Sequence, residues 1–187
     1  FDIAGDVELV SAEPHEFAWQ VEFLCRHFEP VSFHDIVLAV TEGRQLPKRA
    51  VAVTFDDGFE DLYEHAAPIL ERARMPATVF LATDYVSSGE PFWFDLVAYI
   101  VWNAPLESVE VPGTDERLPA SETPASRAAA TYRVLKWLKN CPDTARLQFL
   151  SGLEATYPHL CSQARVSLGR ALNWDEVRQL DRLWHIP

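Results

Sequence analysis

The sequence predicts an α/β fold with parallel strands, and three neighbouring segments carry this prediction. Residues 50–55 and 77–82 are short, apolar and rich in Val, Thr and Phe, which is typical of strands covered on both faces. Between them, residues 59–74 place Leu62, Ile69 and other apolar side chains at helical spacing. A strand, a helix and a second strand within about 33 residues form a βαβ unit, in which the two strands run parallel.

Two helices are predicted before this unit. From residue 14 to residue 28, apolar side chains recur at the spacing of one helical face. The second helix begins after Ser32, which forms an N-terminal capping pattern with Asp35, and it ends at Gly43.

Residues 87–170 differ in character, because Pro and Gly interrupt them repeatedly. Amphipathic helices are predicted within this stretch at residues 126–140 and 143–157. We interpret the stretch as a helical insertion in one domain that covers residues 1–187, rather than as a separate domain.

Aromatic side chains mark two further positions. A last helix is predicted at residues 173–184, with Asn173 as its N-cap and with Trp174 and Trp184 on its core-facing side. The aromatic run at residues 92–94 allows two interpretations. Its rings could line a groove for a sugar, whose ring has apolar faces, or they could form core packing of the insertion against the barrel, and the second is favoured.

The composition argues against several classes of partner. The chain has 28 acidic and 16 basic residues and a net charge of −12, which disfavours nucleic acids and anionic membranes because phosphate contacts need clustered Lys and Arg. The sequence contains no run of about 18 apolar residues that could span a bilayer. Cys25, Cys141 and Cys161 are widely spaced, so they indicate neither a disulfide framework nor a structural zinc site.

The compartment is inferred from two absences. No basic segment followed by an apolar one opens the chain, and the cysteines are unpaired, so the cytoplasm is favoured over export. The chain begins at Phe1 rather than at Met, which leaves room for a trimmed N-terminus. The sequence leaves the oligomeric state open.

Asp56 and Asp57 directly follow the first strand of the βαβ unit, at the end of a parallel strand where ligands bind. Successive strand residues face opposite ways, so one carboxylate can ligate a metal while the other takes a proton from a metal-bound water. Gly58 lets the chain turn sharply after them. Taken alone, the three residues are more simply a turn that caps the next helix, so the flanking sequence has to decide.

The flanks are those of a known family. The stretch LPKRAVAVTFDDGFEDLYEHAAPILERARMPATVFLATDYV, residues 46–86, resembles the polysaccharide deacetylases of carbohydrate esterase family 4, whose first motif is T-F-D-D-G. The resemblance extends in order over residues 17–186 and is thin across the insertion. It implies a distorted (β/α)7-type barrel with a helical insertion, and a chain that holds only the N-terminal part of that barrel.

The resemblance also implies an activity. It implies hydrolytic, metal-dependent deacetylation of an N- or O-acetylated polysaccharide or oligosaccharide. By position, Asp56 would be the general base and Asp57 a ligand of a divalent metal, with zinc expected. The two histidine ligands belong to a second motif, H-x-x-x-H, which is expected beyond residue 187, so the chain by itself is expected to be inactive.

The histidines inside the chain do not replace that motif. The resemblance aligns His185 with a histidine of the family that is not a ligand, and the other five are scattered, with no H-x-x-x-H or H-E-x-x-H spacing: His15, His27, His34, His65 and His159. Asp61 and His65 lie one helical turn apart and could chelate a metal, but a solvated acidic helix face is the simpler interpretation.

Two other functions remain open at this point. The protein could be a catalytically inactive glycan-binding or interaction protein on the same scaffold, although the presence of both Asp56 and Asp57 argues against a decayed site. It could also be a hydrolase of a C–N amide bond in a small molecule. The later motifs of the family would distinguish that activity from deacetylation.

Overall fold

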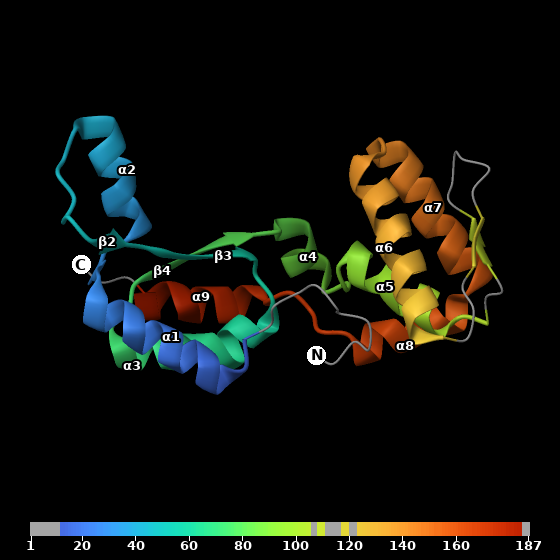
Figure 1. Ribbon diagram of the computed structural model, residues 1–187, viewed down its shortest axis with the longest axis horizontal. Coiled ribbons are helices and arrows are strands. Elements are labelled where there is room, and N and C mark those ends of the chain that lie inside the picture. The colour runs from blue at the N-terminus through green and yellow to red at the C-terminus, as the bar shows by residue number, and fades with distance from the viewer. Residues whose placement is uncertain (1–11, 106–107, 111–116, 120–122, 185–187) are drawn as a thin grey trace. The chain divides into compact units, whose positions relative to one another are not determined.

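The computed structural model describes residues 12–105, 108–110, 117–119 and 123–184 (Figure 1). The described residues divide into two compact units. One contains residues 12–90 and 169–184 and is called the strand unit below. The other contains residues 91–168 and is called the helical unit.

The strand unit contains the predicted βαβ arrangement. Strand β3 (Val53–Asp57) pairs in parallel with β4 (Ala77–Leu81), with Val53 opposite Ala77 and Asp57 opposite Leu81. The parallel orientation is therefore confirmed. The first predicted strand is divided, because β2 (Ala50–Val51) pairs in parallel with β1 (Glu29–Pro30) instead.

The capping signals predicted for the second helix are found in the structure. Asp35 N–H donates to Ser32 Oγ at 3.1 Å, Ser32 N–H donates to Asp35 Oδ2 at 2.9 Å, and Gly43 ends the helix with φ 72°. The helices with their bounds are α1 (Pro14–His27), α2 (Phe33–Glu42), α4 (Thr83–Ser88) and α9 (Trp174–Trp184). Of these, α4 was not predicted.

The helix between β3 and β4 contains one wide turn. A π-helical segment (Leu62–Ala66) precedes α3 (Ala67–Ala73), and Ala67 N–H donates to Leu62 C=O, five residues back. Pro68 lies in the first turn of α3 and has no N–H to donate, so a regular α-helical ladder would be interrupted there. The wide turn accommodates the proline without ending the helix.

The core of the strand unit lies on one face of the strand pair. Figure 1 shows α1, α3 and α9 along one side of β3 and β4. The strand residues that pack against these helices are Val53, Phe55, Ala77, Val79 and Leu81. On the other face Thr54, Asp56 and Phe80 are exposed, so the expected coverage of both faces is not found among the described residues.

The helical unit holds the two predicted helices and two others. Its helices are α5 (Trp93–Asn103), α6 (Pro124–Asn140), α7 (Asp143–Thr156) and α8 (Pro158–Ser167), and β5 (Ser108–Glu110) pairs antiparallel with β6 (Arg117–Pro119). Val97, Val134 and Leu138 are fully buried in one of its cores. Ile100, Cys161 and other side chains of α5 and α8 form a second core.

The aromatic predictions have mixed outcomes. Phe92 is only 1% exposed and stacks on Phe94 with ring centroids 5.3 Å apart, so this ring is buried, while packing of the insertion against the barrel stays a prediction. Trp174 was expected in the core, but this is wrong: the residue is 39% exposed, and its Nε1–H donates to Ser87 Oγ at 3.1 Å. The polar edge of the indole reaches α4, a helix that the sequence pattern did not indicate. The side chain of Trp184 lies outside the described residues.

The α/β class is thus confirmed at the level of mixed helices and parallel strands. Each sheet formed by the described residues has two strands, and these sheets do not close into a barrel. The assignment of one domain with an insertion stays a prediction. None of the described helices combines the length and the apolar character needed to cross a membrane.

Candidate functional site

The two aspartates lie in an unusual backbone conformation at the end of β3. Asp57 has φ 65° and Gly58 has φ 79°, both in the left-handed region. Gly58 N–H donates to Asp56 C=O at 2.7 Å, which closes a turn around Asp57. Left-handed conformations are uncommon for residues other than glycine and gather at functional sites. Residues 56–58 are called the acidic turn below.

Gly58 is required in this turn for two reasons. Its φ favours glycine, and the residue is buried with no space for a side chain. A Cβ atom at this position would lie 2.5 Å from Leu81 Cδ2, well inside van der Waals contact. The prediction that Gly58 shapes the turn is confirmed.

The carboxylates of Asp56 and Asp57 have no side-chain partner in the part of the chain that the structure describes. Asp56 is exposed and Asp57 is half-buried. Among the described residues, no group donates a hydrogen bond to either carboxylate. The turn exists, but its aspartate side chains do not cap the following helix in the described structure. Their roles as general base and metal ligand stay predictions.

A second segment, residues 170–172, is hydrogen-bonded to the acidic turn and to the residues that follow it. Leu172 N–H donates to Gly58 C=O at 2.8 Å, and Glu60 N–H donates to Arg170 C=O at 3.0 Å. Between these two hydrogen bonds, Phe59 and Ala171 form an antiparallel bridge. The backbone that follows β3 is therefore hydrogen-bonded to a segment more than a hundred positions later.

The side chain of Arg170 reinforces this arrangement. Its Nη1–H and Nη2–H donate to Oε2 and Oε1 of Glu176 at 2.9 and 2.8 Å, while its Nε lies 3.2 Å from Glu60 Oε2. The hydrogen bond to Glu176 raises the pKa of Arg170, and the same bond lowers the pKa of Glu176. The sequence analysis missed Arg170, because no local pattern relates it to Glu60.

The described residues do not complete a metal centre. No group of three or more His, Cys, Asp or Glu side chains lies together among them. Asp61 and His65 are both exposed on their helix, in line with a solvated face. Of the ligand set implied by the resemblance, only Asp57 lies in the described residues, and catalytic zinc sites use three protein ligands.

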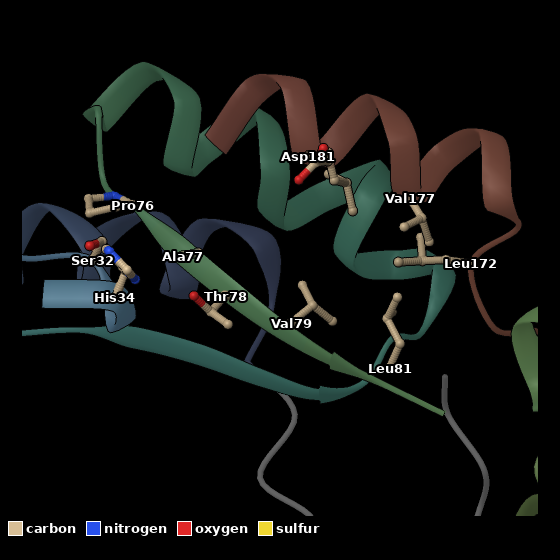
Figure 2. A pocket seen from close by; sticks show the side chains of 11 residues that line it. Ser32, His34, Pro76, Ala77, Thr78, Val79, Leu81, Leu172, Val177 and Asp181 are labelled. Atoms are coloured by element: carbon tan, nitrogen blue, oxygen red, sulfur yellow. The ribbon is translucent and has the colours of Figure 1, made fainter. Parts of the chain in front are cut away.

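A cavity of about 650 Å³ lies in the strand unit, between β4 and α9 (Figure 2). Figure 2 shows Val79, Leu172 and Val177 toward one end and His34 with Ser32 at the other. Neither aspartate of the acidic turn lines this cavity. Two of its lining residues, Leu81 and Leu172, also pack at Gly58, so one end of the cavity adjoins the acidic turn.

Comparisons with known proteins centre on the segment that contains the acidic turn. Residues 43–106 match the family model described as polysaccharide deacetylase. This segment includes β3, β4 and the helix between them. No solved structure matches the chain significantly.

Two curated relatives carry the same name. The poly-beta-1,6-N-acetyl-D-glucosamine N-deacetylase of Escherichia coli strain K12 is 40% identical over 67 residues, which are 36% of this chain and 10% of that protein. Its namesake in Staphylococcus aureus strain MSSA476 is 29% identical over 98 residues, 52% of this chain and 34% of that protein. The matched region thus spans about a tenth and about a third of the lengths of these relatives.

Proposed function

Residues 43–106 belong to the polysaccharide deacetylase family, as the T-F-D-D-G stretch predicted, and from this premise we propose that the protein hydrolyses acetyl groups from a polysaccharide. The observation that carries the proposal is the acidic turn, because the matched segment presents two carboxylates that no described side chain engages. Both relatives are N-deacetylases by name. We therefore extend the proposal to the N-acetyl groups of a poly-N-acetylglucosamine.

In the proposed reaction Asp56 is the general base. Its exposed carboxylate accepts a proton from the water that attacks the acetyl carbonyl carbon. The attack gives a tetrahedral oxyanion, and its collapse breaks the C–N bond. The amine nitrogen takes up a proton as it leaves, so the products are acetate and a free amino sugar. The net charge of −12 is compatible with a neutral substrate and with a cationic product.

Asp57 is proposed as one ligand of a divalent metal, with zinc expected. Its half-buried carboxylate is held next to Asp56 by the left-handed turn, and oxygen ligands of this kind suit zinc. The other proposed ligands are two histidines of the H-x-x-x-H motif, which the sequence analysis expects beyond residue 187. When bound, such a metal polarises a carbonyl and lowers the pKa of water. The proposal also includes the (β/α)7-type barrel that this family implies.

The test is acetate release from N-acetylglucosamine oligomers by the full-length protein, with and without a chelator. The Asp56→Asn variant keeps the shape of the side chain and removes its basicity, so we expect kcat to fall about 100- to 10,000-fold. Asp84→Asn, an exposed aspartate in α4 of the same unit, is the matched control and should leave kcat unchanged.

The outcomes separate the remaining functions. Wild-type turnover by the Asp56→Asn variant would remove Asp56 from the role of base. No acetate release by the wild-type protein, together with binding of the oligomers, would favour the inactive glycan-binding alternative. Release of acetate only from small amides would favour the alternative of small-molecule C–N hydrolysis.

A further inference from the structure

We propose that Arg170 is a positioning residue for the acidic turn, because it fixes residues 170–172 against the backbone that aims Asp56 and Asp57. This inference rests on the proposed function, in which the two carboxylates do the chemistry. Arg170 itself is not proposed to touch the substrate. Neither the family match, which ends at residue 106, nor the sequence patterns assign it a role.

The first step of the argument is that the two carboxylates depend on the backbone for their direction. A catalytic carboxylate is usually oriented by hydrogen bonds to neighbouring groups. Among the described residues, Asp56 and Asp57 have no such partner. Their directions are therefore set by the turn itself, in which Asp57 adopts the left-handed φ of 65°.

The second step is that two neighbours hold this turn. Ala82 N–H donates to Asp57 C=O at 3.1 Å, which continues the pairing of β3 with β4. Leu172 N–H donates to the next carbonyl group, Gly58 C=O, at 2.8 Å. The first bond adjoins a regular five-residue pairing, whereas the second depends on a short segment without helix or strand of its own.

The third step is that Arg170 holds this short segment. Its guanidinium forms a bidentate pair with Glu176, in the first turn of α9, and also reaches Glu60, at the start of the helix after the acidic turn. Nη1–H donates in addition to Ala171 C=O at 2.9 Å. A rigid planar fork can join these three places at once, which a lysine ammonium cannot do with the same geometry.

The surroundings strengthen these contacts. The Glu176 side chain is only 15% exposed and that of Glu60 is 25% exposed, so water competes weakly for their oxygens. Glu176 also accepts a hydrogen bond from Asn173 N–H at 2.8 Å, which ties the same carboxylate to the N-cap of α9. The network thus connects the acidic turn to two helix starts.

The experiment measures the acidic turn directly by NMR of the isotope-labelled chain, so it does not require activity. In Arg170→Met we expect the exchange rate of the Leu172 amide to rise about tenfold, since its hydrogen bond to Gly58 opens more often. We also expect the three-bond couplings that report χ1 of Asp56 and Asp57 to move toward rotamer averaging. Arg170→Lys should give an intermediate result.

Arg165→Met is the matched control. Arg165 pairs with Glu154 in the helical unit, and its side chain is 39% exposed, the same fraction as Arg170. This variant should leave the Leu172 amide and both aspartate couplings at their wild-type values.

A purely structural role makes a different prediction. If Arg170→Met lowers the unfolding temperature but leaves the χ1 couplings of Asp56 and Asp57 unchanged, the positioning role is wrong. If Arg170→Met does not fold, the χ1 couplings of Asp56 and Asp57 are measured in Arg170→Lys and Glu176→Gln instead, and unchanged couplings in both variants would show that the positioning role is wrong. A failed deacetylation assay would leave the NMR result intact, and unchanged couplings would leave the proposed function intact, so the two proposals fail separately.

Discussion

The helical unit and the strand unit use their charged side chains differently. In the helical unit, Arg127 Nη1–H donates to the C=O groups of Val101, Trp102 and Ala104 at 3.1, 2.6 and 3.0 Å, and so satisfies the end of α5. The Arg146 guanidinium carbon lies 5.3 Å from the centroid of the Trp93 ring. These charges serve the local architecture.

In the strand unit, one charged network is also structural, and the two carboxylates at the left-handed acidic turn take no part in it. Arg170 pairs with Glu60 and Glu176, whereas Asp56 and Asp57 have no partner among the described residues. Polar groups whose bonding capacity is unused and whose backbone is strained are candidates for function. The contrast supports the proposal that the chemistry belongs to the strand unit and that the helical unit is scaffold.

The largest expected effect tests whether the helical unit is a core of its own. Leu138→Ala removes a fully buried side chain from the cluster formed with Val97 and Val134, so the free energy of unfolding should fall by about 2–5 kcal/mol. Hydrogen exchange should show the loss in α5 and α6 and leave Leu172 protected. An equal loss of hydrogen-exchange protection in both units would show that the helical unit is not a core of its own.

A glycine in each unit gives the next test. Gly58→Ala places a Cβ 2.5 Å from Leu81 Cδ2 at a φ of 79°, and strain and overpacking together should cost about 2–4 kcal/mol in urea unfolding. Gly152→Ala, inside α7 with nothing within 4 Å of the new atom, should stabilise by about 0.5–1 kcal/mol. Similar effects at both glycines would contradict the close packing inferred around the acidic turn.

The smallest expected effect is a pH dependence confined to the strand unit. Arg170 lowers the pKa of Glu176 in the folded protein, so the pair stabilises the fold above the ordinary pKa of Glu, and this contribution is lost as the pH falls through the lowered value. The loss should not exceed about 1 kcal/mol, because Arg170 is partly exposed. Urea unfolding between about pH 6 and pH 3 measures it. Glu176→Gln should remove this part of the pH dependence, and an unchanged pH profile in that variant would exclude Glu176 as its source.

Local signals made most of the strand unit predictable. The side chains of Ser32 and Asn173 cap the starts of α2 and α9, and the left-handed backbone of Gly43 ends α2, so these helix ends lie where the sequence indicates. The parallel pairing followed from the order of strand, helix and strand. Gly58 indicated a turn, although the left-handed conformation of Asp57 depends on what surrounds it.

The remaining features depend on residues far apart in sequence or on weak periodicity. Helix α5 was missed because apolar residues surround most of its axis, and the exposed Trp174 because its partner Ser87 lies in the unpredicted α4. Pro68 could have indicated an irregular helix, but not which turn would widen. No pattern in a single sequence pairs Arg170 with Glu60.

The pairing of Glu60 with Arg170, 110 positions apart, also sets an order of events during synthesis. The polypeptide emerges N-terminus first, so β3, β4 and the helix between them can form while residues 170–172 are still unmade. The helical unit is built from contacts between neighbouring helices, which form faster than contacts across long separations. The hydrogen bond from Leu172 N–H to Gly58 C=O therefore cannot form until about nine-tenths of this sequence has been translated. A nascent chain on a ribosome that stalls before residue 170 would contain both aspartates but would lack residues 170–172, which hydrogen-bond to the acidic turn and to Glu60.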